Sequence, residues 1–204
     1  MASEIIQVHA GAAWQPIRCE VLFRSYDAEE THPEPNKFSL LASMIQRIER
    51  SFHLEEWRAN ELETSDRELL QSAHKACQAA YSRYSKFNVG SAVRLASGTI
   101  VVGSNQENSA YPSGLCAERV AFFAAGAQHP DDPIVAAAVV TDSTMSVLDF
   151  SPCGGCRQVM QETENRQDMP IRFLMQAGQS NVLISADVSQ FLPLSFKLPA
   201  HRNP

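Results

Sequence analysis

The sequence predicts an α/β fold, a three-layer α/β/α sandwich around a mixed sheet of about five strands. Segments with helical spacing alternate with segments of strand length, in the order helix, hairpin, helix, strand, helix, strand, strand. Residues 134–141 form a continuous apolar run, which is typical of a strand that helices cover on both faces. The chain has 204 residues, of which 44% are hydrophobic, so it can bury the core that such a fold needs.

The first predicted helix of this fold begins at Ser65, where Ser65 and Glu68 match the pattern of a capping box. Apolar residues at helical spacing continue from there to Ala80. Apolar residues then alternate over 87–95, and a short turn leads into 99–102. This alternation around a turn predicts a β-hairpin.

The second half of the fold is predicted to contain two helices and three strands. One helix begins near Cys116 and the other near Cys153. The apolar run 134–141 lies between them, and 171–175 and 182–185 supply the last two strands.

The chain divides near residue 60 in its sequence pattern. Residues 1–60 are predicted to be an N-terminal extension of unknown role, partly helical, in which Ser39 could cap a helix that reaches Phe52. Residues 61–204 are predicted to form the domain that carries the chemistry.

The composition narrows the choice of partners and compartment. The net charge is -6, from 17 basic and 23 acidic residues, and no basic stripe is visible. A nucleic acid polymer is therefore not expected as the partner, and a small molecule is. The sequence shows neither an apolar stretch of roughly 18 to 20 residues for a membrane nor a secretory signal, and its five cysteines are an odd number. We therefore expect a cytoplasmic protein without membrane contact.

Two short motifs carry the expected chemistry, Cys-Ala-Glu-Arg at 116–119 and Pro-Cys-Gly-Gly-Cys-Arg-Gln at 152–158. Cys153 and Cys156 are three residues apart, which places both sulfurs on one face of a helix start. With Cys116 they offer three thiolates and leave the fourth tetrahedral position open for water. This pattern predicts one catalytic Zn²⁺ per chain, because a structural zinc site is closed by four protein ligands.

The predicted site carries an excess of negative charge, because three thiolates outweigh one Zn²⁺. Helix N-termini stabilise thiolates and lower their pKa. A nearby cation would offset the remaining charge, and Arg119 is the first candidate for this supporting role, with Arg157 the second.

Glu118 is the predicted catalytic residue, because it lies two positions from the ligand Cys116. A carboxylate placed there can take a proton from zinc-activated water and pass it to the substrate. Attack of that water on C4 of a pyrimidine, with release of ammonia, is the reaction of the zinc deaminases, whose ligand pattern includes three-cysteine variants.

The sequence resembles the small homotetrameric zinc-dependent cytidine deaminases over residues 62–199. Beyond the two zinc motifs, the resemblance rests on three segments. Residues 84–90 resemble the family's segment before its first strand, 105–111 its nucleoside-binding loop, and 192–196 its C-terminal tail. The resemblance implies the cytidine deaminase-like fold.

The same resemblance implies how a nucleoside is bound. Asn105 and Glu107 bind the ribose 3′-hydroxyl, and Phe87 packs on the base or the sugar. The backbone of Ala117 and Ser151 contacts the pyrimidine.

Two further aromatic residues complete the substrate-binding set that the resemblance implies. Tyr111 ends the nucleoside-binding loop, and Phe196 helps to close a pocket, which can be that of a neighbouring subunit. The implied assembly is a homotetramer, with a homodimer as the alternative.

The function predicted from these residues is hydrolytic deamination of cytidine and deoxycytidine to uridine and deoxyuridine, in pyrimidine salvage. The alternative is a deaminase of a related aminonucleoside such as a nucleoside antibiotic, since that family shares both zinc motifs. Phe87 and the segment 105–111 favour cytidine. A zinc-stabilised binding module without catalysis would need a fourth protein ligand, and Glu118 would then have no role.

Overall fold

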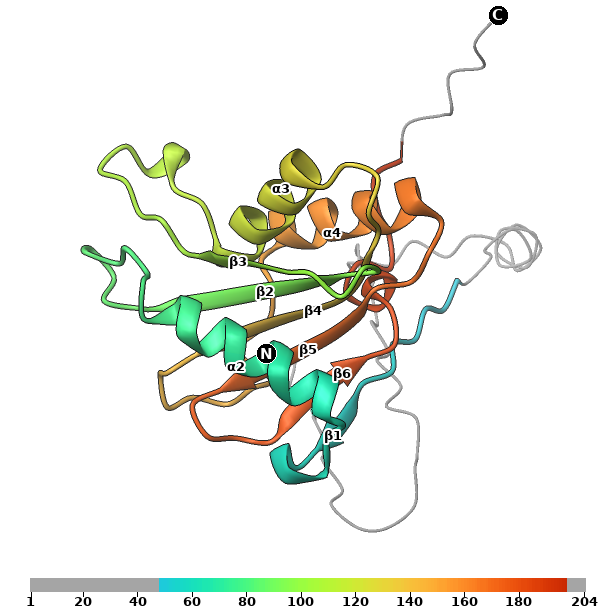
Figure 1. Ribbon diagram of the computed structural model, residues 1–204, viewed down its shortest axis with the longest axis horizontal. Helices are drawn as coiled ribbons and strands as arrows, with labels where there is room; N and C mark the ends of the chain where they lie inside the picture. The colour runs from blue at the N-terminus through green and yellow to red at the C-terminus, as the bar shows by residue number, and fades with distance from the viewer. Residues whose placement is uncertain (1–47, 198–204) are drawn as a thin grey trace, which may run out of the picture. The chain divides into compact units, whose positions relative to one another are not determined.

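The structure, a computed structural model, describes residues 48–197, of which residues 52–197 belong to one compact unit. Its centre is a six-stranded sheet in the order β1-β6-β5-β4-β2-β3 (Figure 1). Strands β4 and β5 pair in parallel and all other neighbours are antiparallel, so the sheet is mixed. The strands are β1 Glu55–Trp57, β2 Val89–Leu95, β3 Ile100–Ser104, β4 Ile134–Thr141, β5 Arg172–Ala177 and β6 Val182–Ser185.

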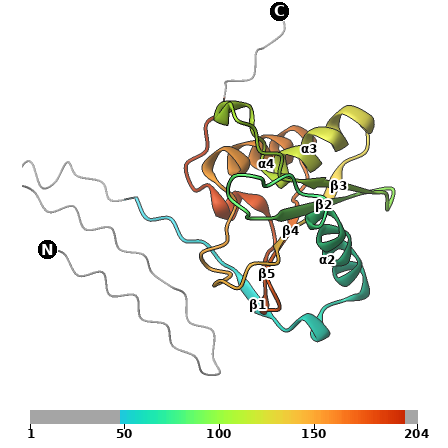
Figure 2. The same cartoon turned by 90° about the vertical axis from the view of Figure 1, so that its left-hand side faces the viewer.

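Three α-helices of the described residues cover the sheet, α2 on one face and α3 and α4 on the other (Figure 2). Their bounds are α2 Thr64–Cys77, α3 Ala117–Gln128 and α4 Gly154–Gln167. Three short 3-10 helices join them, η1 Ala59–Glu61, η2 Tyr111–Ser113 and η3 Val188–Phe191. The predicted three-layer α/β/α sandwich is confirmed.

Strand β4 is apolar throughout because it is buried on both faces of the sheet. Ala136, Ala138 and Val140 belong to the core cluster under α2, whereas Ala137 and Val139 belong to the cluster under α3 and α4. Since successive side chains of a strand point to opposite faces, a strand buried on both faces must be apolar at every position.

Two glycines allow helices to lie directly against the sheet. An added Cβ at Gly90 on β2 would lie 2.1 Å from the backbone oxygen of Ala73 in α2. An added Cβ at Gly103 on β3 would lie 2.6 Å from the backbone oxygen of Ala117 and 2.4 Å from the backbone nitrogen of Ala121, both in α3. Any side chain at either position would displace the helix from the strand.

The predicted hairpin, helices and strands from residue 64 onward are confirmed, but the sheet has a sixth strand. Strand β1 lies within the range assigned to the extension, and it pairs antiparallel with β6. Helix α2 also begins earlier than predicted, at Thr64, and Ser65 forms no side-chain cap. Arg67 instead reaches back to the carbonyl of Leu62 and the hydroxyl of Thr64, which holds the first turn one residue earlier.

The helix predicted between Ser39 and Phe52 falls mostly outside the described residues, which begin at residue 48. Residues 48–54 have no regular structure, and the side chains of Ile48 and Phe52 are exposed, so the helix does not extend to Phe52. Across the described residues, every helix is too short or too polar to traverse a lipid bilayer.

Candidate metal centre and adjoining pocket

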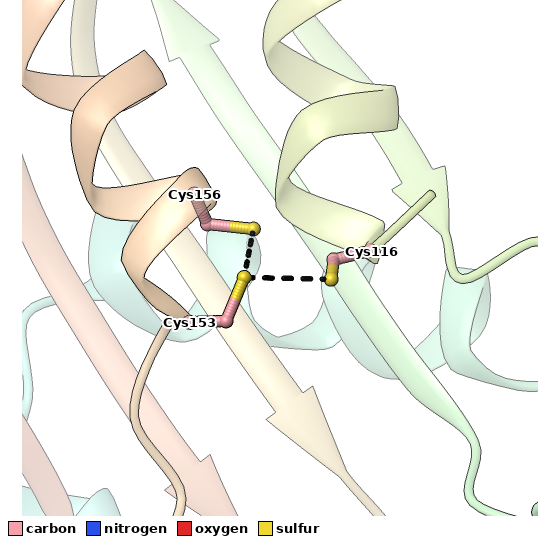
Figure 3. Close-up of side chains that lie close together, drawn as sticks. All are labelled: Cys116, Cys153 and Cys156. Atoms are coloured by element: carbon pink, nitrogen blue, oxygen red, sulfur yellow. Dashed lines mark hydrogen bonds between the residues drawn. The ribbon is translucent and has the colours of Figure 1, made fainter. Parts of the chain in front are cut away.

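The starts of α3 and α4 lie side by side and carry three cysteines (Figure 3). Strands β3 and β4 are both antiparallel to β2, so they run in the same direction and their carboxyl ends point the same way. The helix that follows each of them returns over the same face of the sheet. Both helices therefore begin beside the carboxyl ends of these two strands. Cys116 immediately precedes α3, Cys153 immediately precedes α4, and Cys156 lies in the first turn of α4.

The spacing of the three sulfurs fits a tetrahedral zinc ion. The Sγ atoms of Cys116 and Cys153 are 3.8 Å apart, and those of Cys153 and Cys156 are 3.5 Å apart (Figure 3). Zinc–sulfur bonds of about 2.3 Å in tetrahedral geometry place two sulfurs about 3.8 Å apart. Within residues 48–197 this is the one group of ligand side chains close enough to hold a metal, and it contains three residues. A metal held by these three would keep one position for another ligand.

The polar surroundings stabilise a thiolate at Cys116. Hydrogen bonds from Cys156, Arg119 and Cys153 lower the pKa of the Cys116 thiol to about 5. The pKa of Cys156 is raised, because its thiol donates to Cys116 and is buried. The pKa values of Cys116 and Cys156 are therefore shifted in opposite directions, and a bound metal would displace the remaining thiol protons.

The two candidate cations differ in what they contact. Nη2 of Arg119 lies 3.9 Å from the sulfur of Cys116 and 3.4 Å from the backbone oxygen of Gly114. Its Nε is buried and has no hydrogen-bond partner among the described residues. Arg157 directs its guanidinium to oxygen atoms of Ser151, Pro152 and Phe191 instead. The contact with a ligand sulfur therefore belongs to Arg119.

Glu118 is buried at the start of α3, with 5% of its surface exposed. Burial is the main reason that its pKa rises to about 7, and the neighbouring Cys116 charge raises it further. A carboxyl group with a pKa near neutrality can both accept and donate a proton, which general acid–base catalysis requires.

A cavity of about 650 Å³ opens beside Cys116, Glu118 and Cys153. This volume is typical of pockets for small molecules. Six of the seven residues predicted to bind substrate line it: Phe87, Asn105, Glu107, Tyr111, Ala117 and Ser151.

Phe196, the seventh residue, does not line this cavity. It lies in a second groove beside Phe123, Gln158 and Val159, on the outer side of α3 and α4. The side-chain amide of Gln158 bonds to both the N–H and the carbonyl of Phe196, and 68% of the Phe196 surface is exposed. Phe196 thus cannot close this cavity from its present position, and its contact with a neighbouring subunit stays a prediction.

Asn105 and Glu107 both hold the segment before β2. The Asn105 side chain accepts from the N–H of Val89 at 2.8 Å and donates to the carbonyl of Phe87 at 2.9 Å. The Glu107 carboxylate accepts from the N–H of Tyr84 at 2.7 Å and from the hydroxyl of Ser85. The Ser85 hydrogen bond is the main reason that the pKa of Glu107 is lowered.

Several residues of the cavity wall could not be assigned to the site from the sequence, among them Met145, Asp149 and Phe150. The ring of Phe150 packs edge-on against that of Phe87, with centroids 6.2 Å apart. The available signal was the position of Phe150, an aromatic residue two places before the Pro-Cys-Gly-Gly-Cys motif.

The sequence of this chain is similar to those of known proteins. The family model described as the cytidine and deoxycytidylate deaminase zinc-binding region matches residues 63–169. The chain is 44% identical over 94 residues to a cytidine deaminase of Halalkalibacterium halodurans, covering 46% of this chain and 68% of that protein. It is 41% identical over 128 residues to a cytidine deaminase of Sporosarcina psychrophila, covering 63% of this chain and 88% of that protein.

Solved structures show the same similarity. The crystal structure of cytidine deaminase from Burkholderia pseudomallei superimposes with a TM-score of 0.56 at 33% identity, covering 64% of this chain and 98% of that one. The structure of cytidine deaminase from Mycobacterium tuberculosis gives a TM-score of 0.51 at 29% identity, covering 67% and 100%.

Proposed function

The chain belongs to the cytidine and deoxycytidylate deaminase family, and from this premise we propose that it hydrolyses cytidine and deoxycytidine to uridine and deoxyuridine with release of ammonia. The observation that carries the proposal is the three-cysteine cluster, which meets the small-molecule cavity beside a buried carboxylate. Members of this family are hydrolases, and both the cluster and Glu118 fall inside the matched region 63–169.

The metal of the proposed site is one Zn²⁺ per chain, held by Cys116, Cys153 and Cys156. The separations of the three sulfurs and their place at two helix starts support this assignment. When bound there, zinc supplies Lewis acidity and lowers the pKa of water to near neutrality. Arg119 offsets the charge of the thiolates, because its guanidinium contacts the sulfur of Cys116.

Glu118 moves the protons of the proposed reaction. Its carboxylate takes a proton from the attacking water and delivers it to N3 of the pyrimidine ring, which makes C4 more electrophilic. The second proton of that water then passes through the same carboxylate to the amino group, which leaves as ammonia. Burial of Glu118 supports this role, since a carboxylate shielded from bulk water exchanges protons with the substrate alone.

The remaining cavity residues hold the nucleoside in the proposed complex. The edge-on pair Phe87 and Phe150 provides an apolar surface for the base. Asn105 and Glu107 are already fixed by the backbone of the preceding segment, and we assign them to the sugar hydroxyl. Preorganised polar groups of this kind bind a ligand at low entropic cost.

The wider setting of the activity is proposed from the family and the sequence together. We assign the catalytic unit to residues 61–204, with strand β1 extending its sheet, and leave the role of the earlier residues open. We propose a cytoplasmic homotetramer that acts on free nucleosides in pyrimidine salvage. Exposed Phe196 and Phe123 on the outer side of α3 and α4 are suited to contact between subunits.

Steady-state kinetics of the purified enzyme on four substrates tests the proposal. Cytidine and deoxycytidine should lose their amino group, followed as loss of ultraviolet absorbance, whereas free cytosine should react far more slowly. An aminonucleoside antibiotic should be a poor substrate. No turnover of cytidine or deoxycytidine by zinc-loaded protein would refute the proposal, and efficient turnover of the antibiotic alone would replace it by the alternative.

A variant at Glu107 tests whether the sugar is recognised. Glu107 lines the cavity, and in the proposed complex its carboxylate accepts a hydrogen bond from the sugar hydroxyl, which free cytosine lacks. Glu107→Ala should therefore weaken cytidine turnover strongly and change the slow reaction of cytosine little. Glu68→Ala, which removes an exposed carboxylate from α2 on the other face of the sheet, is the control and should change neither. Equal losses on both substrates in Glu107→Ala would show that Glu107 supports the fold of the segment and does not read the sugar.

A further inference from the structure

Arg157 lies one residue after Cys156, yet its guanidinium donates to oxygen atoms of two chain segments, residues 151–152 and Phe191. Nε donates to the carbonyl of Pro152 at 2.7 Å, Nη2 to the hydroxyl of Ser151 at 2.8 Å, and Nη1 to the carbonyl of Phe191 at 3.1 Å. Each of the three nitrogens therefore has its own oxygen acceptor. A planar guanidinium offers donors in a fixed fork, so three acceptors held in this way fix one another's positions.

The first two acceptors, Pro152 and Ser151, belong to the loop between β4 and α4, which forms one wall of the cavity. Met145, Asp149, Phe150 and Ser151 all line the cavity from this loop. Inside the loop, the N–H groups of Asp149 and Phe150 donate to carbonyls of the same loop, at 3.1 and 3.2 Å. These are local turn bonds, and the buried side chains of Val147 and Phe150 pack the loop against the core. Among the residues of the loop that line the cavity, Ser151 is exposed, so its position depends on polar contacts.

The third acceptor lies on a rigid part of the molecule. Phe191 ends the short helix η3, is 7% exposed, and packs against the ring of Phe173 in β5 with centroids 5.4 Å apart. Arg157 itself starts from the first turns of α4, and Met160 in the same helix is fully buried. The guanidinium thus connects the cavity wall to two anchored elements.

We propose that Arg157 is a positioning residue, which holds the Ser151 wall of the cavity at the distance that the pyrimidine ring requires. By bonding the Ser151 hydroxyl and the Pro152 carbonyl, it leaves the Ser151 backbone free to face the base and sets how close Phe150 comes to Phe87. This inference rests on the proposed function for its substrate. It assigns Arg157 to binding geometry, distinct from the charge compensation that Arg119 provides.

The kinetic test compares Arg157→Ala and Arg157→Lys with the parent enzyme on cytidine. Arg157→Ala should raise KM about tenfold, which corresponds to the loss of roughly one positioning hydrogen bond, while kcat and zinc content change less. Arg157→Lys should restore little, since an ammonium cannot reach three acceptors in one plane. Added guanidinium ion should lower the KM of Arg157→Ala. An unchanged KM, or a loss of zinc that accounts for the whole defect, would overturn the proposal.

Arg172→Ala is the matched control on the opposite face of the sheet. Arg172 donates through two nitrogens to the buried carboxylate of Asp66, at 3.1 and 3.0 Å, so its loss should destabilise the fold at least as much as loss of Arg157. The KM of Arg172→Ala should stay at the parent value and should not respond to guanidinium. If both variants raise KM equally, the effect is general destabilisation and the proposal fails.

Hydrogen exchange tests the same claim without substrate. In Arg157→Ala the amides of Asp149 and Phe150 should exchange faster, while those of α2 remain as in the parent. Should Arg157→Ala not fold, Ser151→Ala removes one acceptor only and should show a smaller effect at the same amides. This measurement also decides the matter if the parent enzyme fails to deaminate cytidine. Unchanged exchange in Arg157→Ala would refute the proposal that Arg157 holds the Ser151 wall in place, whatever the substrate is.

Discussion

Cysteines lie at helix ends on both faces of the sheet. One is at the end of α2 on one face, and the others are at the starts of α3 and α4 on the other face. Cys77 is the last residue of α2, and its sulfur lies 2.7 Å from Oδ1 of Asp142. Burial and this carboxylate raise the pKa of Cys77 to about 12. At the start of α3, hydrogen bonds from Cys156, Arg119 and Cys153 lower the pKa of Cys116 to about 5.

The difference shows that burial and polar neighbours decide a cysteine's chemistry, because Cys156 also lies at a helix start and yet has a raised pKa. The C-terminal end of a helix is partly negative and offers carbonyls, whereas the N-terminal end is partly positive and offers N–H groups. Cys77 meets a negative group and stays a thiol. Cys116 meets hydrogen-bond donors and a guanidinium, and it is poised to bind a metal.

The largest expected effect is at Glu118, the buried carboxylate at the start of α3. Glu118→Gln should keep the fold and the zinc but lower cytidine turnover by at least about 10³-fold, because an amide cannot carry a proton. Single-turnover rates with metal analysis on the same sample measure both quantities. Activity within tenfold of the parent would remove Glu118 from the mechanism.

The second largest effect is expected when the cysteines at the two helix ends, Cys116 and Cys77, are replaced in turn and the zinc contents are compared. Cys116→Ala should lose zinc and activity, since two sulfurs hold the metal far more weakly than three. Cys77→Ala should retain a full complement of zinc and near-parent activity. Equal zinc content in the two variants, measured by metal analysis after dialysis, would contradict the ligand assignment.

A smaller effect is expected from the two glycines that bring helices against the sheet. Gly103→Ala should push the first turn of α3 outwards, which moves Cys116 away from Cys153 and lowers kcat/KM and zinc affinity by about 10- to 100-fold. Gly90→Ala should disturb α2 to a similar extent and lower the melting temperature, with zinc affinity unchanged. Chelator competition and thermal unfolding on both variants give the comparison, and equal zinc affinities would show that α3 tolerates the shift.

The smallest expected effect is the alkaline titration of Cys77. Because its folded pKa of about 12 exceeds its ordinary value of 9.0, the thiol favours the folded state fully below about pH 9. That contribution is lost as the pH rises through 12. The difference in unfolding free energy between the parent and Cys77→Ala should therefore shrink between these pH values, as denaturant titrations would measure. A constant difference would mean that burial and Asp142 do not raise the pKa of Cys77 in the folded state.

Helices and strands whose burial produces a regular pattern of apolar residues could be predicted from the sequence. A strand that forms only by pairing with a distant part of the chain could not. The apolar run 134–141 became β4 with the same bounds, because burial on both faces requires an apolar residue at every position. Strand β1 has three exposed residues, and only its pairing with β6 makes it a strand. Local pattern carries no information about that pairing.

The candidate site divides in the same way. The three cysteines could be grouped from their spacing and from the way strands and helices alternate, and the structure brings their sulfurs together. The cavity wall around Phe150 could not be predicted, since it depends on how a loop folds back against Phe87. The same holds for the acceptors of Arg157, one of which is 34 residues away in the chain.

Strand β1 also has a consequence for how the molecule behaves at high concentration. Strand β6, which is buried at all four positions, would otherwise form the edge of the sheet and could pair with a strand of another chain. Among residues 48–197, β1 is instead the outermost strand on this side of the sheet; it is three residues long and carries the exposed carboxylates of Glu55 and Glu56. A short, negatively charged edge repels its own copies, so β1 protects the sheet from edge-to-edge aggregation.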